Sequence, residues 1–501
     1  MTAKHGNASN YVRRILVAAL LTVALIAAAT VDLGHGPAGP STLFAPAFSV
    51  SPASSDSSTW YCAVPRLDKA PGVSIQLELT NLTVRAQRAA IDFYAANGND
   101  VHKSVSVAAA SNRQVALSLP ADKPGGVEIA FPGGGNVVGL MATGTQGYSQ
   151  LLCQPSPGPQ WLVEGMSTLG NSTGGLAVFN PFAADAIVDI SFLTPSGFQQ
   201  PGPLQAIVLK GHSTTEVYLP DWLQGVDPIA AQVTTRIGRV VAGAIEVRSD
   251  SGASGVVLPP VSAEIFSNYD FPLLSETTNQ AVTLQLYNLS DTQQNATVSI
   301  RPLASTGAES PTTTQASATT VEAGSPRFKE SVPAQGTLGI PLKTIASVPI
   351  GTPFSMHVSG GVVALVVVKG STAGPLAGLF EVPGVKIAWH RWLELAYGPP
   401  GGLAGNQVAM VVGSAANRGS GLVEPFYFVR KVSPTAQLKG IDSTAGVPFV
   451  IDRTKVQVYS SSFPGGLPAA FTISTSNSTV AAMALIGGDG SLTPFSQIPV
   501  S

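Results

Sequence analysis

The five residues Val137-Val138-Gly139-Leu140-Met141 recur in outline three more times along the chain. Each later copy keeps the order of a β-branched pair, small residues and an apolar end: Val240-Val241-Ala242-Gly243-Ala244, Val362-Val363-Ala364-Leu365-Val366 and Thr479-Val480-Ala481-Ala482-Met483. Self-similarity at a regular spacing indicates a repeat architecture. The spacing matches one small β-sandwich domain of about 100 residues, so we expect four units that share a strand of this type.

Two further segments of each unit repeat upstream of this strand. The opening strand reads Leu77–Leu82, Leu176–Pro181 and Leu284–Leu289 in the first three copies, while Met410–Ser414 lacks the asparagine. The repeated amides, which we expect to cap a strand-end turn, are Asn81, Asn180 and Asn288. Aromatic residues recur where the units begin, and we expect Trp60, Trp161 and Trp392 to anchor the cores.

The periodicity inside the units is close to two, which is typical of strands. Ile75, Leu77 and Leu79 alternate with polar neighbours, and 52 glycines and 39 prolines punctuate the 501 residues at short intervals. These patterns predict an all-β fold of tandem immunoglobulin-like β-sandwiches. A β-propeller is the main alternative, but its blades of roughly 40 to 50 residues are half the length of these units.

Changes in composition along the chain give the expected segment and domain boundaries. They predict a cytoplasmic head at 1–14, a signal anchor or signal peptide at 15–33, a Pro/Ser/Ala-rich stalk at 34–59, and four sandwiches at 60–156, 157–262, 263–386 and 387–501. The third sandwich carries a Ser/Thr/Pro tract at 304–327, which is too polar to order itself by burial. We interpret it as a tolerated loop insertion, with an O-glycosylated or partner-facing loop as the alternative.

The N-terminus predicts export. Lys4, Arg13 and Arg14 precede an apolar run that begins at Ile15, and this charge bias places the head in the cytoplasm and the rest outside. The run is close to the roughly 20 residues that a spanning helix needs. A retained single-pass anchor and a secreted form cleaved near Ala27–Ala29 are both compatible with it, whereas a lipoprotein is excluded because no cysteine follows the run.

The composition argues against nucleic-acid binding. Charged residues make up 11% of the chain and the formal net charge is -2, whereas soluble domains carry about 25% charged residues. The sequence contains no basic block of the kind that gives an electrostatic footprint for DNA or RNA. A surface of hydroxyls, amides and backbone is instead typical of proteins that work outside cells.

The two cysteines, Cys62 and Cys153, bracket the first unit. An even count in an exported chain favours a disulfide, and the first and last strands of a sandwich often run close together. A metal or redox pair would need a different spacing. We therefore expect a Cys62–Cys153 bond that closes the first unit.

Catalytic motifs are sparse. Residues Gly170-Asn171-Ser172-Thr173-Gly174 match the G-x-S-x-G pattern letter for letter, but that elbow needs a strand before it and a helix after it. Here the opening strand of the second unit follows, so a turn is the better interpretation. The sequence contains no H-x-x-x-H, C-x-x-C or EF-hand spacing, and we expect neither a metal nor another cofactor.

The aromatic residues that do not repeat are the candidate contact residues. These are Trp222, in the segment Leu219–Leu223, and the neighbours Trp389 and His390. Extracellular sandwiches often bind ligands through exposed aromatic rings. A position that recurs in every unit serves folding, so we place function at these unshared positions.

The Trp60-Tyr61-Cys62 start after a Ser-rich stalk, followed by tandem β units that end in Val-Val-Gly/Ala strands, resembles a family of uncharacterised actinobacterial envelope proteins. The resemblance covers the chain from about Trp60 and implies an envelope location and a role in cell-surface glycan biology, without assigning catalytic residues. The resulting hypothesis is a non-catalytic scaffold that contacts an envelope protein or polysaccharide. The alternative is an extracytoplasmic hydrolase of envelope glycan or ester with Ser172 as nucleophile.

Overall fold

The computed structural model describes residues 58–384 and, beyond them, the backbones of the strands that lie between residues 391 and 499. Gaps before residue 384 fall at 71, 96–99, 110, 145–147, 251–252, 264–265, 267, 278–279, 303–325, 353 and 371–378. Within the described residues the elements are β-strands and three one-turn 3-10 helices, with no α-helix. The prediction of an all-β protein is confirmed for this part of the chain.

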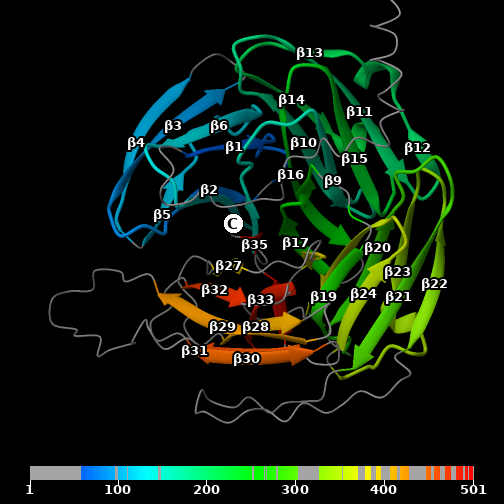
Figure 1. Ribbon diagram of the computed structural model, residues 1–501. Helices are drawn as coiled ribbons and strands as arrows, with labels where there is room; N and C mark the ends of the chain where they lie inside the picture. The colour runs from blue at the N-terminus through cyan, green and yellow to red at the C-terminus, as the bar shows by residue number, and fades with distance from the viewer. Residues whose placement is uncertain are drawn as a thin grey trace, which may run out of the picture. The chain divides into compact units, whose positions relative to one another are not determined.

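Unit 1 comprises eight strands in two antiparallel sheets. The strands are β1 (Ser58–Val64), β2 (Ser74–Asn81), β3 (Gln87–Ala95), β4 (Val101–Val107), β5 (Ser111–Ala116), β6 (Gly125–Phe131), β7 (Asn136–Thr143) and β8 (Tyr148–Leu152). One sheet has the order β1-β6-β3-β4 and the other the order β5-β2-β7-β8. These strands appear in blue to cyan in Figure 1.

Unit 2 has the same plan with extra short strands. Its elements are β9 (Gln160–Met166), β10 (Thr173–Asn180), β11 (Ala186–Thr194), β12 (Gly197–Gln199), η1 (Gly202–Leu204), β13 (Ile207–Leu209), β14 (Ser213–Tyr218), η2 (Leu219–Asp221), β15 (Ile229–Ile237), β16 (Val241–Asp250), β17 (Ala253–Val257) and β18 (Val261–Ser262). One sheet has the order β12-β11-β15-β9-β18, with β13 also paired to β11, and the other the order β14-β10-β16-β17.

Units 3 and 4 repeat the plan. Unit 3 contains β19 (Asn268–Leu274), β20 (Ala281–Tyr287), β21 (Gln294–Pro302), β22 (Arg327–Val332), β23 (Thr337–Pro341), η3 (Leu342–Thr344), β24 (Phe354–Ser359), β25 (Val363–Lys369) and β26 (Leu379–Pro383). Unit 4 contains β27 (Arg391–Ala396), β28 (Gln407–Gly413), β29 (Arg418–Tyr427), β30 (Val447–Asp452), β31 (Val456–Ser462), β32 (Ala469–Thr475), β33 (Ala481–Gly488), β34 (Ser491–Pro494) and β35 (Ser496–Pro499). Their sheets have the orders β19-β24-β21-β22, β23-β20-β25-β26, β30-β29-β32-β27-β35 and β31-β28-β33-β34.

The strand order corrects the immunoglobulin-like prediction. In an immunoglobulin domain the first strand shares a sheet with the second. Here the first strand of unit 1, β1, pairs with β6, while β2 pairs with β5 and β7. The equivalent pairings recur in every unit. The repeated two-sheet unit is therefore real, but its first and seventh strands have exchanged places relative to the immunoglobulin arrangement.

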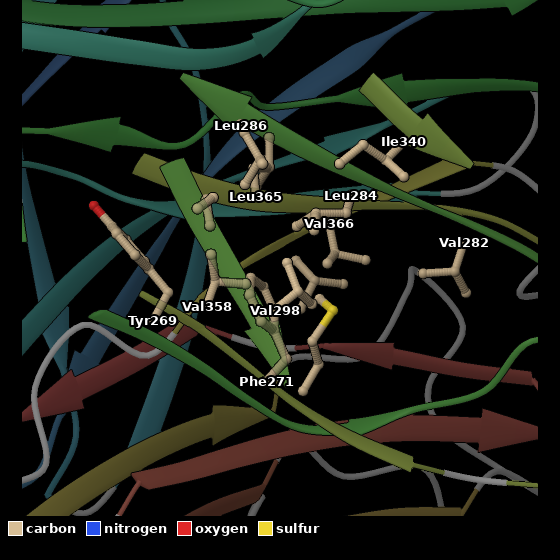
Figure 2. Close-up of a cluster of buried hydrophobic side chains, with 14 of the residues drawn as sticks. Tyr269, Phe271, Val282, Leu284, Leu286, Val298, Ile340, Val358, Leu365 and Val366 are labelled. Atoms are coloured by element: carbon tan, nitrogen blue, oxygen red, sulfur yellow. The ribbon is translucent and has the colours of Figure 1, made fainter. Parts of the chain in front are cut away.

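Apolar side chains fill the space between the two sheets of each described unit. In unit 3 the core contains Leu284 and Val366 from one sheet and Phe271 and Val298 from the other. Figure 2 shows these side chains gathered in one cluster. Strands β3 and β24 alternate between buried and more exposed residues as predicted, whereas β7 is buried along almost its whole length. The prediction of half-buried strands thus holds for some strands only.

The repeated asparagines cap turns as predicted. These asparagines are Asn81, Asn180 and Asn288. In each, the side-chain amide donates to the carbonyl four residues later at 2.7–2.8 Å. The side-chain oxygen accepts the backbone N–H two residues later at 2.9–3.1 Å. Each amide also donates to two carbonyls at the end of another strand, such as Val332 and Pro333 for Asn288. One side chain therefore holds two chain reversals together in each unit.

The predicted anchors and the predicted disulfide are present. Trp60 and Trp161 are 1% and 2% exposed, and the Trp161 indole donates to the Val240 carbonyl at 2.7 Å. Cys62 in β1 and Cys153, which directly follows β8, form a disulfide with their Cα atoms 4.9 Å apart. The bond therefore joins the two ends of unit 1.

Several predictions fall outside the described residues. These are the head, the segment 15–33, the stalk up to residue 57, most of the tract at 304–327, and the side chain of Trp392. Among the residues that are described, no helix is long and apolar enough to cross a membrane. The anchor and the signal peptide both remain predictions.

Candidate functional site

The residues that the sequence singles out do not come together in one site. Trp222 caps the C-terminus of η2, where its backbone N–H donates to the Leu219 carbonyl. Its half-buried side chain packs against the core of unit 2, so much of the indole serves folding. Trp389 and His390 lie outside the described residues.

Ser172 lies in the turn before β10 and not in a nucleophile elbow. It is 4% exposed, and its hydroxyl accepts the backbone N–H of Ser249 at 3.2 Å. A strand follows it, whereas the elbow requires a helix. The hydroxyl is therefore used to join the turn to the end of β16.

Two histidine–aspartate pairs occur on neighbouring strands. His102 contacts Asp92 at 2.5 Å and His357 contacts Asp270 at 2.7 Å. Each pair is exposed or partly exposed and consists of direct cross-strand neighbours. Within the described part of the chain, no group of three or more His, Cys, Asp or Glu side chains is arranged to hold a metal ion.

The surface feature with the clearest capacity for binding lies at one end of unit 2. Phe182, Val208 and Ile237 are 43%, 54% and 58% exposed. Val208 and Ile237 are the cross-strand partners of Ile187 on either side of β11, so these three aliphatic residues form a row on one sheet face. We call Phe182, Ile187, Val208, Ile237 and Arg239 the rim patch.

The local backbone explains why apolar side chains face outward here. The pairing of β11 with β15 shifts register between Ile187 and Val188, and a bulge of this kind inserts a residue and redirects side chains. Gly238 has a φ of +84°, and a Cβ at this position would lie 3.0 Å from the Cβ of Ala186. The turn therefore requires glycine, and it brings Ile237 and Arg239 to the surface.

An open depression of about 360 Å³ adjoins the row. It is lined by Asn180, Phe182, Ala184, Asp185, Gly238 and Arg239. Around it, Lys210 pairs with Asp185 and Arg236 pairs with Asp189, both at 2.7 Å. These contacts lower the pKa of both aspartates, first of all through the hydrogen bonds from Lys210 and Arg236. Arg239 is exposed and has no such partner among the described residues.

Sequence reasoning missed the rim patch because its members are separated along the chain and ordinary in type. Ile187 faces outward through the ordinary alternation of β11, but the register shift that turns Ile237 outward depends on the pairing of β15 with β11, which lies far away in the sequence. One signal was available. The Ile237-Gly238-Arg239 turn places a large aliphatic residue and a cation in the connection between β15 and β16, where neither is needed for folding.

Comparison with known proteins gives a family match over part of the chain and no activity. Residues 135–327 match the family described as "Family of unknown function (DUF5719)", which agrees with the expected resemblance to an uncharacterised family. No curated protein matches the chain. A solved glycoside hydrolase family 32 from Bifidobacterium adolescentis aligns over 87% of this chain and 99% of its own at 8% identity, with a TM-score of 0.14. A score this low carries no argument about fold or function.

Proposed function

We propose that this protein is a non-catalytic, extracytoplasmic scaffold of the cell envelope that contacts a partner protein through the rim patch. The observation that carries the proposal is the exposed apolar row beside Arg239, which has no ion-pair partner among the residues that the structure describes. We further propose that segment 15–33 tethers the protein to the membrane with its head inside and its β units outside. A secreted form after cleavage is the alternative.

The chemistry of the rim patch fits a protein surface. Exposed contiguous apolar side chains mark interaction sites, and aromatic residues and arginine are enriched at the centres of interfaces. Lys210 and Arg236 are already neutralised by aspartates, whereas Arg239 is free to take a carboxylate. The fitting partner therefore presents an apolar strip with one acidic side chain beside it.

A polysaccharide partner fits the patch less well. Sugar rings are bound mainly on flat aromatic faces, and the rim patch contains one phenylalanine against three aliphatic side chains. The hydrolase alternative has no support from the described residues, because the Ser172 hydroxyl is buried and bonded to the backbone.

Site-specific photo-crosslinking in cells tests this proposal. A photoreactive amino acid replaces Val208 or Ile237 in the full chain, and the matched control replaces Ile350, which is 62% exposed in unit 3. We expect a defined protein adduct at positions 208 and 237 and none at 350. We also expect Arg239→Glu to abolish the adduct and Arg88→Glu, at an exposed position of β3, to preserve it.

Other outcomes reject the proposal. Equal adducts at all three positions would show non-specific proximity, and the absence of adducts at positions 208 and 237 would remove the rim patch as a contact surface. A carbohydrate adduct at these positions would replace the protein partner by a polysaccharide. An adduct that survives Arg239→Glu would contradict the role of the free cation.

A further inference from the structure

The contact between units 2 and 3 contains a buried cluster of charged side chains. Arg248 of β16 is 2% exposed and lies at its centre. Its Nε donates to Glu246 at 2.8 Å, and its Nη2 lies 3.3 Å from Glu381 of β26 and 3.8 Å from Asp227. The same guanidinium donates to the carbonyl of Gly165 in β9. One arginine thus joins three acids and a backbone carbonyl from the two units.

The backbone around the cluster is shaped to receive these groups. Gly165 has a φ of +85°, and a Cβ there would lie 2.4–2.6 Å from the carboxyl atoms of Glu381. Its N–H donates to the hydroxyl of Tyr287, which in turn donates to Gln285 at 2.6 Å. The Thr337 hydroxyl donates to the Pro228 carbonyl at 2.9 Å. The two units therefore meet through directional bonds as well as through charge.

Acidic groups outnumber basic ones in this cluster. The titratable and charged groups that act on Glu381 or Glu246 are Glu164 on β9, Asp227 before β15, Arg248 on β16 and Tyr287 on β20, and Tyr269 on β19 interacts in turn with Glu164. Three carboxyl groups, those of Glu246, Glu381 and Asp227, thus face the single guanidinium of Arg248, and full ionisation would give the buried contact two more negative than positive charges. Uncompensated buried charge is strongly destabilising.

The negative charges of the individual carboxyl groups are not equally compensated by hydrogen bonds and solvent. The Glu246 oxygens accept from Arg248 and from the Ser167 N–H. The Glu381 side chain is 2% exposed, and neither of its oxygens accepts a hydrogen bond from the described residues, although Arg248 is close. The Asp227 side chain is 28% exposed. The cluster therefore contacts solvent through Asp227, while Glu381 is buried and receives the least hydrogen-bond support.

We propose that the contact between units 2 and 3 is a proton-dependent lock, closed while Glu246 and Glu381 hold protons and loosened when they lose them. A protonated Glu381 adds no negative charge, so Arg248 can be balanced by the remaining acids. Loss of the protons leaves like charges facing one another across the contact, and separation of the units lets water solvate them. This proposal goes beyond the scaffold function and does not require it.

The direction of the effect follows from burial. Burial raises the pKa of Glu246 to about 7 and raises the pKa of Glu381 well above its ordinary value, although Arg248 opposes the shift in both. A raised pKa means that the closed state binds more protons than the open one. The contact is therefore most stable below the ordinary glutamate pKa of 4.5, and its stability falls as the pH rises toward and through 7.

Hydrogen–deuterium exchange of the full chain tests the lock. After correction for the intrinsic rate at each pH, we expect exchange in the β9 segment Gln160–Met166 to rise at least tenfold between pH 6 and pH 9. Exchange in β3, which lies in unit 1, is expected to stay constant. Glu381→Gln and Glu246→Gln imitate the protonated acids, so each should reduce the rise to less than threefold.

Asp291→Asn is the matched control, because Asp291 is an exposed acid of unit 3 outside the cluster. This variant should keep the wild-type pH dependence of exchange in the β9 segment. A pH-independent rate in the wild-type β9 segment overturns the proposal even if a variant fails to fold. An undiminished rise in both glutamine variants overturns it as well, and so does an equal rise in β3, which would indicate global loosening.

Discussion

At the residue scale, each of the three capping asparagines stabilises two loops through the hydrogen bonds of a single side chain. Asn288 is fully buried, donates to the carbonyls of Thr292, Val332 and Pro333, and accepts the N–H of Ser290. Only an amide supplies two donors and an acceptor at this geometry. Aspartate would turn the donors into acceptors, and alanine would leave three carbonyls and one N–H without partners.

We therefore predict that Asn288→Ala lowers the free energy of unfolding by about 2 to 3 kcal/mol, because buried polar groups lose their hydrogen bonds. Denaturant unfolding monitored by circular dichroism measures the change. Asn295→Ala, at an exposed position of β21 in the same unit, is the control and should change it by less than about 0.5 kcal/mol. Equal effects of the two substitutions would contradict the capping role.

Single residues also show where sequence patterns fail. The alternation from Ile75 to Thr80 predicts that Glu78 and Thr80 face solvent, yet both are fully buried. Burial raises the pKa of Glu78 to about 7. The pattern gives the positions of the strand residues, but exposure depends on what covers the second face of the sheet, and the sequence near Glu78 holds no information about that cover.

At the scale of strands, local signals locate the elements but not their partners. The segments predicted as opening strands correspond to β2, β10 and β20 because their β-branched and large apolar residues and the following asparagine are local features. The pairing of β1 with β6 brings together residues that are 61 to 73 positions apart in the sequence. Such non-local pairings are set by packing, so the exchange of first and seventh strands could not be predicted from periodicity.

The disulfide connects two of these distant elements. Cys62 and Cys153 are separated by 91 residues, and cross-linking a loop of this length restricts the unfolded chain by up to about 4 to 5 kcal/mol on the chain-entropy model. We predict that the Cys62→Ala/Cys153→Ala double variant lowers the stability of unit 1 by up to this amount. Denaturant unfolding followed by exchange in β2 and β7 measures it.

Reductant provides the internal control for this prediction. It should lower the stability of the wild-type chain toward that of the double variant and leave the double variant unchanged. Exchange in β20 and β25 of unit 3 should not respond to either treatment. An equal loss of protection in unit 3 would contradict a role that is local to unit 1.

At the scale of the whole molecule, the described units make extensive contacts with one another, and these contacts were the least predictable feature. The described part of the chain belongs to one compact unit, and Ile245, Val256 and Leu258 of unit 2 complete the core of unit 1. Arg66 of unit 1 pairs with Glu216 of unit 2 at 2.7 Å. The sequence predicts tandem sandwiches but not how they are arranged, because each repeat reads as a complete unit by itself.

Some signals of these contacts were nevertheless present in the sequence. Glu164, Glu246 and Arg248 lie within otherwise apolar strands of a chain with only 11% charged residues. A charge in such a strand is either exposed or paired in a buried contact. The pattern could have marked them as contact residues, but it could not have joined Glu381 to Arg248, since that pair depends on how units 2 and 3 meet.

Gly243 provides a test of the contact between units 1 and 2. It lies in β16 of unit 2, and a Cβ at this position would be 2.1 Å from the carbonyl oxygen of Ala63 in β1 of unit 1. That atom belongs to the backbone and cannot rotate away, so the two strands can approach this closely only if the residue is glycine. We predict that Gly243→Ala forces β1 and β16 apart and costs about 1 to 3 kcal/mol, as overpacking does.

Gly202→Ala is the matched control in the same unit, because a Cβ there meets nothing within 4 Å. Denaturant unfolding and hydrogen exchange of the full chain measure both variants. Gly243→Ala should increase exchange in β1 and β16 while β21 of unit 3 keeps its wild-type rate, and Gly202→Ala should leave all three unchanged. Wild-type exchange in β1 of the Gly243→Ala variant would show that the close approach of these strands does not hold units 1 and 2 together.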